Sequence, residues 1–212
     1  MKTTILWDHD GVLVDTEPWY FAATQSAIKP LGVDLEQAAY LADMAHGKSA
    51  WERAKAIGAS DQDVALHKAR RDELYRQYLR TEDIEIEGVL KTLATLAQSF
   101  QMAIITTSKR IDFELIHAER QIVDHMSFVL CSGDYPRSKP HPDPYLAGLE
   151  RFAVSAEETL VVEDSERGLT AAVAAGIDCV VVANAFVRGQ DLSKASYFVD
   201  SIGELPELLK GL

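Results

Sequence analysis

The chain contains 212 residues, of which 47% are hydrophobic and 25% charged, and it carries a formal net charge of −12. This length is enough to bury a substantial core, either as one large domain or as a domain with an insertion, and the composition is ordinary for a soluble globular protein. The acidic balance argues against a nucleic-acid partner, because binding to a phosphate backbone depends on clustered Lys and Arg.

The first predicted element is a short buried strand over Ile5–Trp7, which ends in two carboxylates, Asp8 and Asp10, followed by Gly11. In an open α/β sheet, the carboxyl ends of the strands form the edge where ligands bind. Gly11 permits a turn that lets both acids face one ligand. An EF-hand calcium loop is excluded, because its glycine stands at the sixth position, whereas here it is the fourth residue and the apolar run Val12–Val14 follows.

Helical periodicity without a strand characterises the next segment, from Glu17 to about residue 85. Pro18 suits the first turn of its first helix, and Gly58 closes its third. The predicted helices cover residues 18–28, 35–45, 49–57 and 61–80. Because the opening strand is not stable alone and must pair with strands that come later, this helical block is an insertion.

Strands and helices alternate after Gly88. The predicted strands cover residues 101–106, 127–131, 159–162, 179–183 and 197–199, and the helices cover 89–98, 110–120, 142–152, 167–175 and 202–209. Such alternation implies right-handed crossovers and a parallel sheet covered by helices on both faces. We therefore expect a doubly wound parallel α/β core formed by residues 1–15 and 86–212, and a helical cap domain at 16–85 that is placed to act as a lid.

Three further polar clusters follow predicted strands and would lie at the same edge of the sheet as Asp8. They are Thr106–Ser108, Lys139 and Glu163–Ser165. Each has a simpler explanation alone, because hydroxyls and acids cap helices and a lysine is commonly a solvated cation. Their convergence favours a site, since strand ends of one parallel sheet meet at one edge. Carboxylates gathered in one cleft repel one another and require a cation, and oxygen ligands favour Mg²⁺.

These segments resemble the four sequence motifs of the haloacid dehalogenase superfamily. The closest resemblance is to the branch with a small helical cap after the first strand, which includes β-phosphoglucomutase and phosphoglycolate phosphatase. Residues 8–16, Asp-x-Asp-Gly-Val-Leu-x-Asp-Thr, match the first motif, and Thr106 matches the second. Residues 139–145, Lys-Pro-x-Pro-Asp-x-Tyr, match the third, and residues 163–165, Glu-Asp-Ser, match the fourth. The resemblance covers nearly the whole core in order and spacing.

The resemblance implies that Mg²⁺ is held by the side chains of Asp8 and Asp164 and by the backbone carbonyl of Asp10, with Glu163 acting through bound water. Asp8 would then attack phosphorus and form an aspartyl-phosphate, which splits one difficult step into two. Asp10 would donate a proton to the leaving oxygen and later activate water, a role worth about 10²–10⁴-fold in rate.

The same resemblance implies a set of contacts to the phosphoryl group. Thr106 and Lys139 would hold its oxygens, with Lys139 supplying positive charge. The backbone N–H groups of His9, Asp10 and Thr107 are further candidate donors, and Ser108 is a further candidate substrate contact.

Five residues of the helical block are candidates for substrate recognition. His46, Gly47 and Lys48 resemble the glycine-centred loop that approaches the active site in this cap class. Trp19 and Tyr20, on the first helix of the block, are candidates for one wall of the substrate site. The alternative for all five is packing within the cap or a solvated loop.

Other branches of the superfamily fit less well. The dehalogenases lack the second acid of the first motif, which is Asp10 here. The phosphonate-cleaving branch also lacks it and needs a cap lysine that forms a Schiff base, for which Lys48 is a poor match. β-Phosphoglucomutase carries a histidine where we align Tyr20 and an arginine where we align Ala50, and without that arginine a second phosphate group loses its positive partner.

We therefore expect a Mg²⁺-dependent phosphatase that hydrolyses a small phosphorylated metabolite, such as a sugar phosphate or a similar monoester. Phosphoglycolate and nucleotide monophosphates also fit the motifs. The alternatives are a phosphosugar mutase similar to β-phosphoglucomutase and a non-catalytic module that binds Mg²⁺ and a phosphorylated metabolite.

The sequence also favours a reducing compartment without a membrane partner. Cys131 and Cys179 lie in apolar strand contexts that suit reduced, buried thiols. The N-terminal residues lack the apolar run of a signal peptide, and no segment approaches the roughly 20 apolar residues that span a bilayer. We expect a cytoplasmic monomer or weak homodimer.

Overall fold

The computed structural model describes residues 1–211 and divides the chain into two compact units. Unit 1 comprises Met1–Asp15 together with the chain from Glu85 onward, and unit 2 comprises Thr16–Ile84. Unit 1 is interrupted once in sequence, so its first strand must pair with strands that follow unit 2.

Unit 1 is built on one six-stranded sheet in which every paired strand is parallel. The strands are β1 (Thr4–Trp7), β2 (Gln101–Ile105), β3 (Phe128–Leu130), β4 (Thr159–Glu163), β5 (Asp178–Val182) and β6 (Tyr197–Val199). Their order across the sheet is β3-β2-β1-β4-β5-β6. The chain therefore builds outward from β1 in one direction and then in the other, which places the topological switch point beside β1, where ligands bind in such sheets. The predicted doubly wound parallel fold is confirmed.

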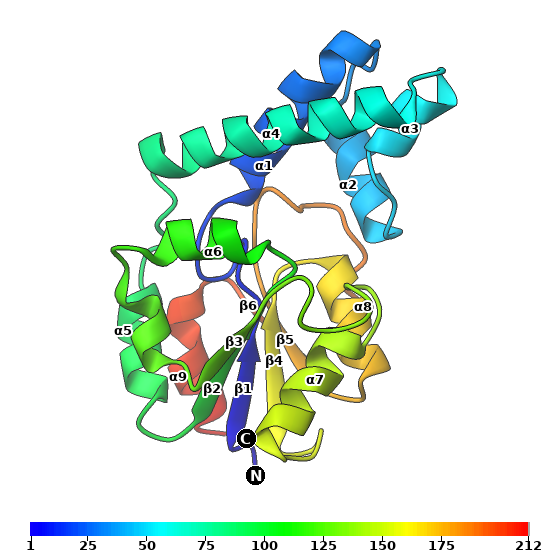
Figure 1. Cartoon of the computed structure of the whole chain (residues 1–212). Coiled ribbons are helices and arrows are strands. Elements are labelled where there is room, and N and C mark those ends of the chain that lie inside the picture. The colour runs from blue at the N-terminus through cyan, green and yellow to red at the C-terminus, as the bar shows by residue number, and fades with distance from the viewer. Residues whose placement is uncertain (212) are drawn as a thin grey trace. The chain divides into compact units, whose positions relative to one another are not determined.

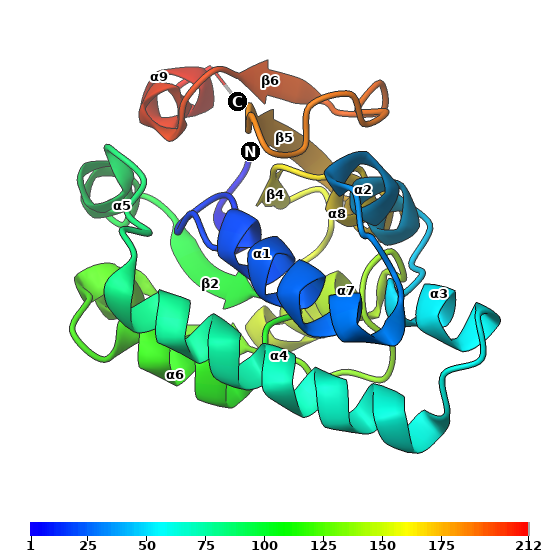
Figure 2. The same cartoon turned by 90° about the horizontal axis from the view of Figure 1, so that it is seen from above.

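Helices cover both faces of this sheet, with α7 and α8 on one side and α5, α6 and α9 on the other (Figures 1 and 2). Their bounds are α5 (Val89–Leu96), α6 (Arg110–His117), α7 (Asp143–Phe152), α8 (Glu166–Ala174) and α9 (Leu205–Leu209), with short 3₁₀ helices at η2 (Gln121–His125) and η3 (Ile202–Glu204). All four residues of β1 are buried. Leu6 of β1 shares one core cluster with Tyr145 of α7 and Leu169 of α8. A strand buried on both faces explains why the sequence shows a continuous apolar run there.

The structure differs from the sequence-based expectation after α6. A helix was expected over residues 110–120, but α6 ends at His117 and η2 follows. Arg120 has an extended backbone, with φ −111° and ψ 141°, which interrupts the helix. Its side chain donates a hydrogen bond to the carbonyl of Ile116 at 2.5 Å, and so satisfies an acceptor at the helix end.

Unit 2 contains only helices among residues 16–84. They are α1 (Glu17–Ile28), η1 (Lys29–Leu31), α2 (Gln37–Ala45), α3 (Trp51–Ala56) and α4 (Asp61–Thr81). The first and last of these pack against each other through aromatic pairs, with 5.6 Å between the ring centres of Trp19 and Tyr78 and 5.0 Å between those of Tyr20 and Tyr75. Ser60 begins α4 with a capping box that it forms with Asp63.

The two chain connections of unit 1 that flank the insertion lie side by side. Val14 forms a bridge with Asp10 and a second, antiparallel bridge with Glu85. The turn between Asp10 and Val14 is closed by the N–H of Gly11, which donates to the carbonyl of Val14 at 2.7 Å. The chain therefore leaves and re-enters the α/β unit at adjacent points, directly after the two acids that follow β1.

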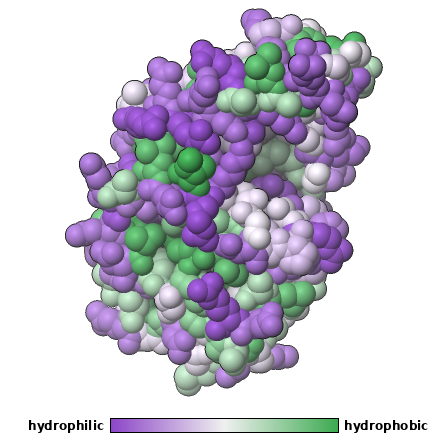
Figure 3. All heavy atoms as spheres, in the orientation of Figure 1, coloured by the Kyte–Doolittle hydropathy of each residue, from purple (hydrophilic) through white to green (hydrophobic). Residues whose placement is uncertain are grey.

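No helix among residues 1–211 is both long enough and apolar enough to cross a bilayer. On the face of the molecule drawn in Figure 3, hydrophobic areas are broken up by hydrophilic residues. Scattered apolar side chains of this kind are normal on a protein surface.

Candidate active site

The turn after β1 brings two carboxylates to one side of the sheet edge. Asp8 continues the pairing of β1, because its N–H donates to the carbonyl of Val162 in β4 at 2.8 Å. Gly11 then adopts φ +87°, and a Cβ at this position would lie 2.0 Å from Oδ2 of Asp164. Only glycine permits both this conformation and this close approach. The first and fourth motifs are therefore packed directly against each other.

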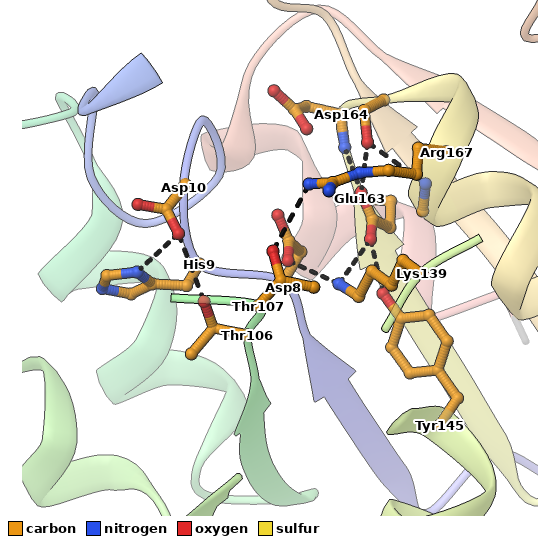
Figure 4. A network of polar contacts seen from close by, with 12 residues as sticks. Asp8, His9, Asp10, Thr106, Thr107, Lys139, Tyr145, Glu163, Asp164 and Arg167 are labelled. Carbon is orange, nitrogen blue, oxygen red and sulfur yellow. Dashed lines mark hydrogen bonds and ion pairs between the residues drawn. The ribbon is translucent and has the colours of Figure 1, made fainter. Parts of the chain in front are cut away.

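Asp10 is held by hydroxyl groups from the loop after β2. Its Oδ2 accepts a hydrogen bond from Oγ1 of Thr106 at 3.2 Å (Figure 4). The same oxygen accepts a second hydrogen bond, from Oγ of Ser108, at 2.6 Å. The Thr106 hydroxyl also accepts a bond from the N–H of Ser108 at 3.0 Å, and its carbonyl accepts one from the Tyr135 hydroxyl at 2.7 Å. These contacts fix the orientation of the Asp10 carboxylate with respect to β2.

Lys139 lies between two buried carboxylates. Its Nζ donates to Oδ1 of Asp8 at 2.5 Å and to Oε1 of Glu163 at 2.7 Å, and only 4% of the residue is exposed. The Tyr145 hydroxyl, from α7, donates to the same oxygen of Glu163 at 2.6 Å. The Lys139 ammonium also lies 4.7 Å from the centre of the Tyr145 ring, within the range of a cation–π contact. Third-motif and fourth-motif residues thus meet beside Asp8.

The charges of this cluster shift one another's pKa values. Burial, reinforced by the charge of Glu163, raises the pKa of Asp8 to about 6, although Lys139 opposes the shift. Burial alone would lower the pKa of Lys139, but Asp8 and Glu163 outweigh it and raise that pKa. Burial would likewise raise the pKa of Glu163, yet Lys139 and the Tyr145 hydrogen bond hold it below its ordinary value. Lys139 is therefore charged at neutral pH, and ionisation of Asp8 is less favoured than ionisation of Glu163.

Three carboxylates of the cluster satisfy the geometry of a cation site. Oxygen atoms of Asp8, Glu163 and Asp164 all lie within 4.8 Å of one another. Asp164 is oriented by Asn184, whose amide donates to its Oδ2 at 2.7 Å and to the Gly11 carbonyl at 3.4 Å. Hard oxygen donors in this number suit Mg²⁺, and a divalent cation would oppose the effect of burial and of Glu163, which raise the pKa of Asp8. The residues present therefore fit the ion that the sequence motifs imply.

The structure brings the candidate residues of unit 1 together at the carboxyl edge of the sheet (Figure 4). They are Asp8, His9, Asp10, Thr106, Thr107, Ser108, Lys139, Glu163 and Asp164. The imidazole of His9 is fully buried among protein groups, with its Nε2 2.8 Å from Nε2 of His117 and its Nδ1 3.2 Å from Oδ2 of Asp10. Thr107 accepts a hydrogen bond from Arg167 of α8 at 3.3 Å.

The candidate residues of unit 2 occupy two places within that unit. Trp19 and Tyr20 lie on α1, and the Tyr20 hydroxyl accepts a hydrogen bond from the buried Arg71 at 2.6 Å. His46, Gly47 and Lys48 form the exposed turn after α2. In that turn, Nδ1 of His46 lies 2.7 Å from the Ala42 carbonyl, and Gly47 adopts φ +67°. Their role toward a substrate remains a prediction.

Sequence reasoning missed three residues that contact the site. Asn184 follows β5 closely, at the same sheet edge as the predicted residues, so the strand-end rule applied elsewhere would have found it. Arg167 and His117 lie in helices, and their positions in sequence give no sign of their partners. The contact between His117 and His9 joins residues 108 positions apart.

Comparisons with known proteins agree with this architecture. The family model described as haloacid dehalogenase-like hydrolase matches residues 5–182. Phosphoglycolate phosphatase from Colwellia psychrerythraea is 31% identical, with 99% of this chain and 97% of the relative covered, and protein CbbY from Cereibacter sphaeroides is 28% identical, with 97% and 94% covered.

Solved structures show the same fold. The crystal structure of β-phosphoglucomutase from Clostridium difficile superimposes with a TM-score of 0.83 at 21% identity and covers 100% of this chain and 96% of its own. The region matched by the family model, residues 5–182, includes all four sequence motifs and extends through β5. The chain therefore belongs to the haloacid dehalogenase-like hydrolase family.

Proposed function

We propose that this protein is a Mg²⁺-dependent phosphatase that hydrolyses a small phosphorylated metabolite through an aspartyl-phosphate formed on Asp8. The observation that carries the proposal is the arrangement around Asp8, whose carboxylate lies 2.5 Å from the Lys139 ammonium and within 4.8 Å of oxygens of Glu163 and Asp164. A carboxylate nucleophile needs nearby positive charge, because it must approach a negatively charged phosphoryl group. The relative named phosphoglycolate phosphatase, 31% identical along nearly its whole length, supports the reaction class.

The side chains of Asp8 and Asp164 would hold Mg²⁺ with the backbone carbonyl of Asp10, and Glu163 would act through bound water. Bound there, the ion would neutralise phosphoryl charge and allow Asp8 to remain ionised. Lys139 places a second positive charge beside the nucleophilic oxygen.

Two proton transfers would fall to Asp10. It is the carboxyl group nearest to Asp8 in sequence, and the Ser108 and Thr106 hydroxyls hold it in place. Protonated Asp10 would donate to the leaving oxygen as Asp8 attacks phosphorus and the ester bond breaks. The resulting carboxylate would then take a proton from water, which attacks the aspartyl-phosphate and releases inorganic phosphate. Thr106 and the backbone N–H groups of His9 and Thr107 would contribute donors to the phosphoryl oxygens.

We further propose that the helical unit is a cap that governs access and substrate choice. Trp19, Tyr20 and the turn formed by His46, Gly47 and Lys48 are the residues to which we assign substrate contact. Tyr20 and Ala50 stand where a phosphosugar mutase of this family would carry a histidine and an arginine, which favours hydrolysis over transfer to a second oxygen. The buried free thiols of Cys131 and Cys179 suit a reducing compartment, and we assign the protein to the cytoplasm.

The decisive experiment is a panel of phosphorylated metabolites assayed for released phosphate, with Mg²⁺ and with a chelator in its place. We expect Mg²⁺-dependent release from at least one ester and its loss in Asp8→Asn, which keeps the shape of the side chain but removes the nucleophile. Mass spectrometry of acid-quenched protein should detect one added phosphoryl group on wild type and none on the variant.

Other outcomes would favour the alternatives. Conversion of a hexose 1-phosphate to its 6-phosphate, without free phosphate, would identify a mutase. Saturable binding of a phosphorylated metabolite with no turnover of any ester would identify a binding module and overturn the proposed chemistry.

A further inference from the structure

Arg167 is a cation at the active-site edge that none of the four motifs includes. It is the second residue of α8, and its side chain reaches Thr107, the second residue after β2, with 3.3 Å between Nη2 and Oγ1. Figure 4 shows its guanidinium extending from α8 toward Thr107. The side chain is only partly buried, so part of it faces solvent.

Helix stability does not explain a cation at this position. The N-terminal turn of a helix carries partial positive charge, which favours acidic residues and disfavours Lys and Arg. Glu166 and the Ser165 cap follow this preference, because the Ser165 hydroxyl accepts the N–H of Gly168 at 3.2 Å. Arg167 is the exception within the same turn. Its location is better explained by the carboxylates of the active site, which lie at the edge of the sheet where α8 begins.

The charge of the site calls for more than one cationic side chain. Four carboxylates, those of Asp8, Asp10, Glu163 and Asp164, lie at this edge. Lys139 is bonded to two of them. An ammonium has three N–H donors, so at most one remains for a phosphoryl oxygen. A phosphate monoester would bring further negative charge into the same space.

Resting on the phosphatase function proposed above, we propose that Arg167 is a second cationic ligand of the phosphoryl group. A guanidinium presents a planar set of five N–H donors, so it can keep its bond to Thr107 and still donate to phosphoryl oxygens. It stays charged throughout the reaction and takes no part in proton transfer. Its contribution is to donate to the non-bridging oxygens while Asp8 attacks, beside the proposed Mg²⁺, because Lys139 is already bonded to two carboxylates.

The test compares Arg167→Gln and Arg167→Lys with a matched control, Arg151→Gln. Arg151 is an exposed arginine on the last turn of α7, and it stacks over Phe128 at the amino end of β3, away from the site. Two readouts are used: the dissociation constant of inorganic phosphate in the presence of Mg²⁺, measured by calorimetry, and kcat/KM for the ester turned over fastest. Loss of a charge-assisted hydrogen bond predicts about a 10- to 100-fold weakening in both for Arg167→Gln. A smaller loss is expected for Arg167→Lys, and none for Arg151→Gln.

Two results would overturn the proposal. The first is phosphate affinity and turnover of Arg167→Gln equal to those of Arg151→Gln. The second is that Thr107→Val reproduces the whole loss and that adding Arg167→Gln to it causes no more, since Arg167 would then act only by positioning Thr107. If wild type turns over no ester, the phosphatase proposal fails, and phosphate affinity alone decides the role of Arg167. Weaker binding by Arg167→Gln would support it, and equal or absent binding would overturn it.

Discussion

Replacing Gly168 with alanine tests the construction of the site, because helix propensity and the structure predict opposite signs for the change in stability. Gly168 lies in the first turn of α8. On propensity alone, alanine would stabilise the helix by about 1 kcal/mol. In the structure, however, a Cβ at this position would lie 1.7 Å from Oε1 and 2.2 Å from Oε2 of Glu163. The carboxylate must therefore move.

Movement of Glu163 would break its bonds to Lys139 at 2.7 Å and to Tyr145 at 2.6 Å. Glu163 is fully buried, and breaking a buried ion pair costs about 3–5 kcal/mol. Subtracting the gain in propensity leaves a net loss of about 2–4 kcal/mol in the free energy of unfolding. Binding of Mg²⁺ should weaken as well, because Glu163 is one of the three carboxylates of the cation site.

The assay is urea unfolding followed by circular dichroism, with calorimetry for Mg²⁺. Gly203→Ala is the matched control, because its Cβ would meet nothing nearer than Oγ of Ser201 at 3.7 Å. That variant should stay within about 0.5 kcal/mol of wild type. A Gly168→Ala protein as stable as wild type, with unchanged affinity for Mg²⁺, would refute the reasoning.

Two further predictions concern the cation site. Asn184→Ala removes the amide that holds Oδ2 of Asp164 at 2.7 Å, so Mg²⁺ affinity measured by calorimetry should fall about 10- to 100-fold, and unchanged affinity would contradict the assigned role. Burial and Glu163 raise the pKa of Asp8 to about 6. Below that pH a proton occupies the carboxylate and competes with the metal, whereas above it the carboxylate is free to bind. Mg²⁺ affinity should therefore drop about tenfold for each pH unit below 6 and level off above it, and a constant affinity between pH 4.5 and 7 would argue against Asp8 as a ligand.

The sequence was sufficient for the fold because its signals are local. The apolar run of β1 is buried along its whole length, and such runs end in polar residues at the edge where ligands bind. The same rule points to Asp8, Thr106 and Glu163, and in the short loop after β5 it points to Asn184.

The side-chain network could not be predicted in this way. The sequence motifs predict that the Thr106 hydroxyl holds a phosphoryl oxygen, whereas its donation to Asp10 is visible only in the structure. The contact between His9 and His117 depends on how α6 packs on the sheet, which periodicity does not specify. The same is true of Arg167, whose contact with Thr107 joins α8 to the loop after β2.

The bridge between Val14 and Glu85 has a consequence for how this enzyme type can diversify. The inserted segment leaves the α/β unit after Val14 and returns at Glu85, its bridge partner. A segment with such adjacent ends can be shortened, lengthened or exchanged without distorting the α/β unit, because closing even a long loop adds little entropic cost. Every carboxylate and cation assigned here to phosphoryl transfer belongs to the α/β unit, and none is contributed by residues 16–84. Under the cap function proposed above, a chimera that carries a foreign helical segment between Asp15 and Glu85 would therefore inherit new selectivity while keeping its reactive centre.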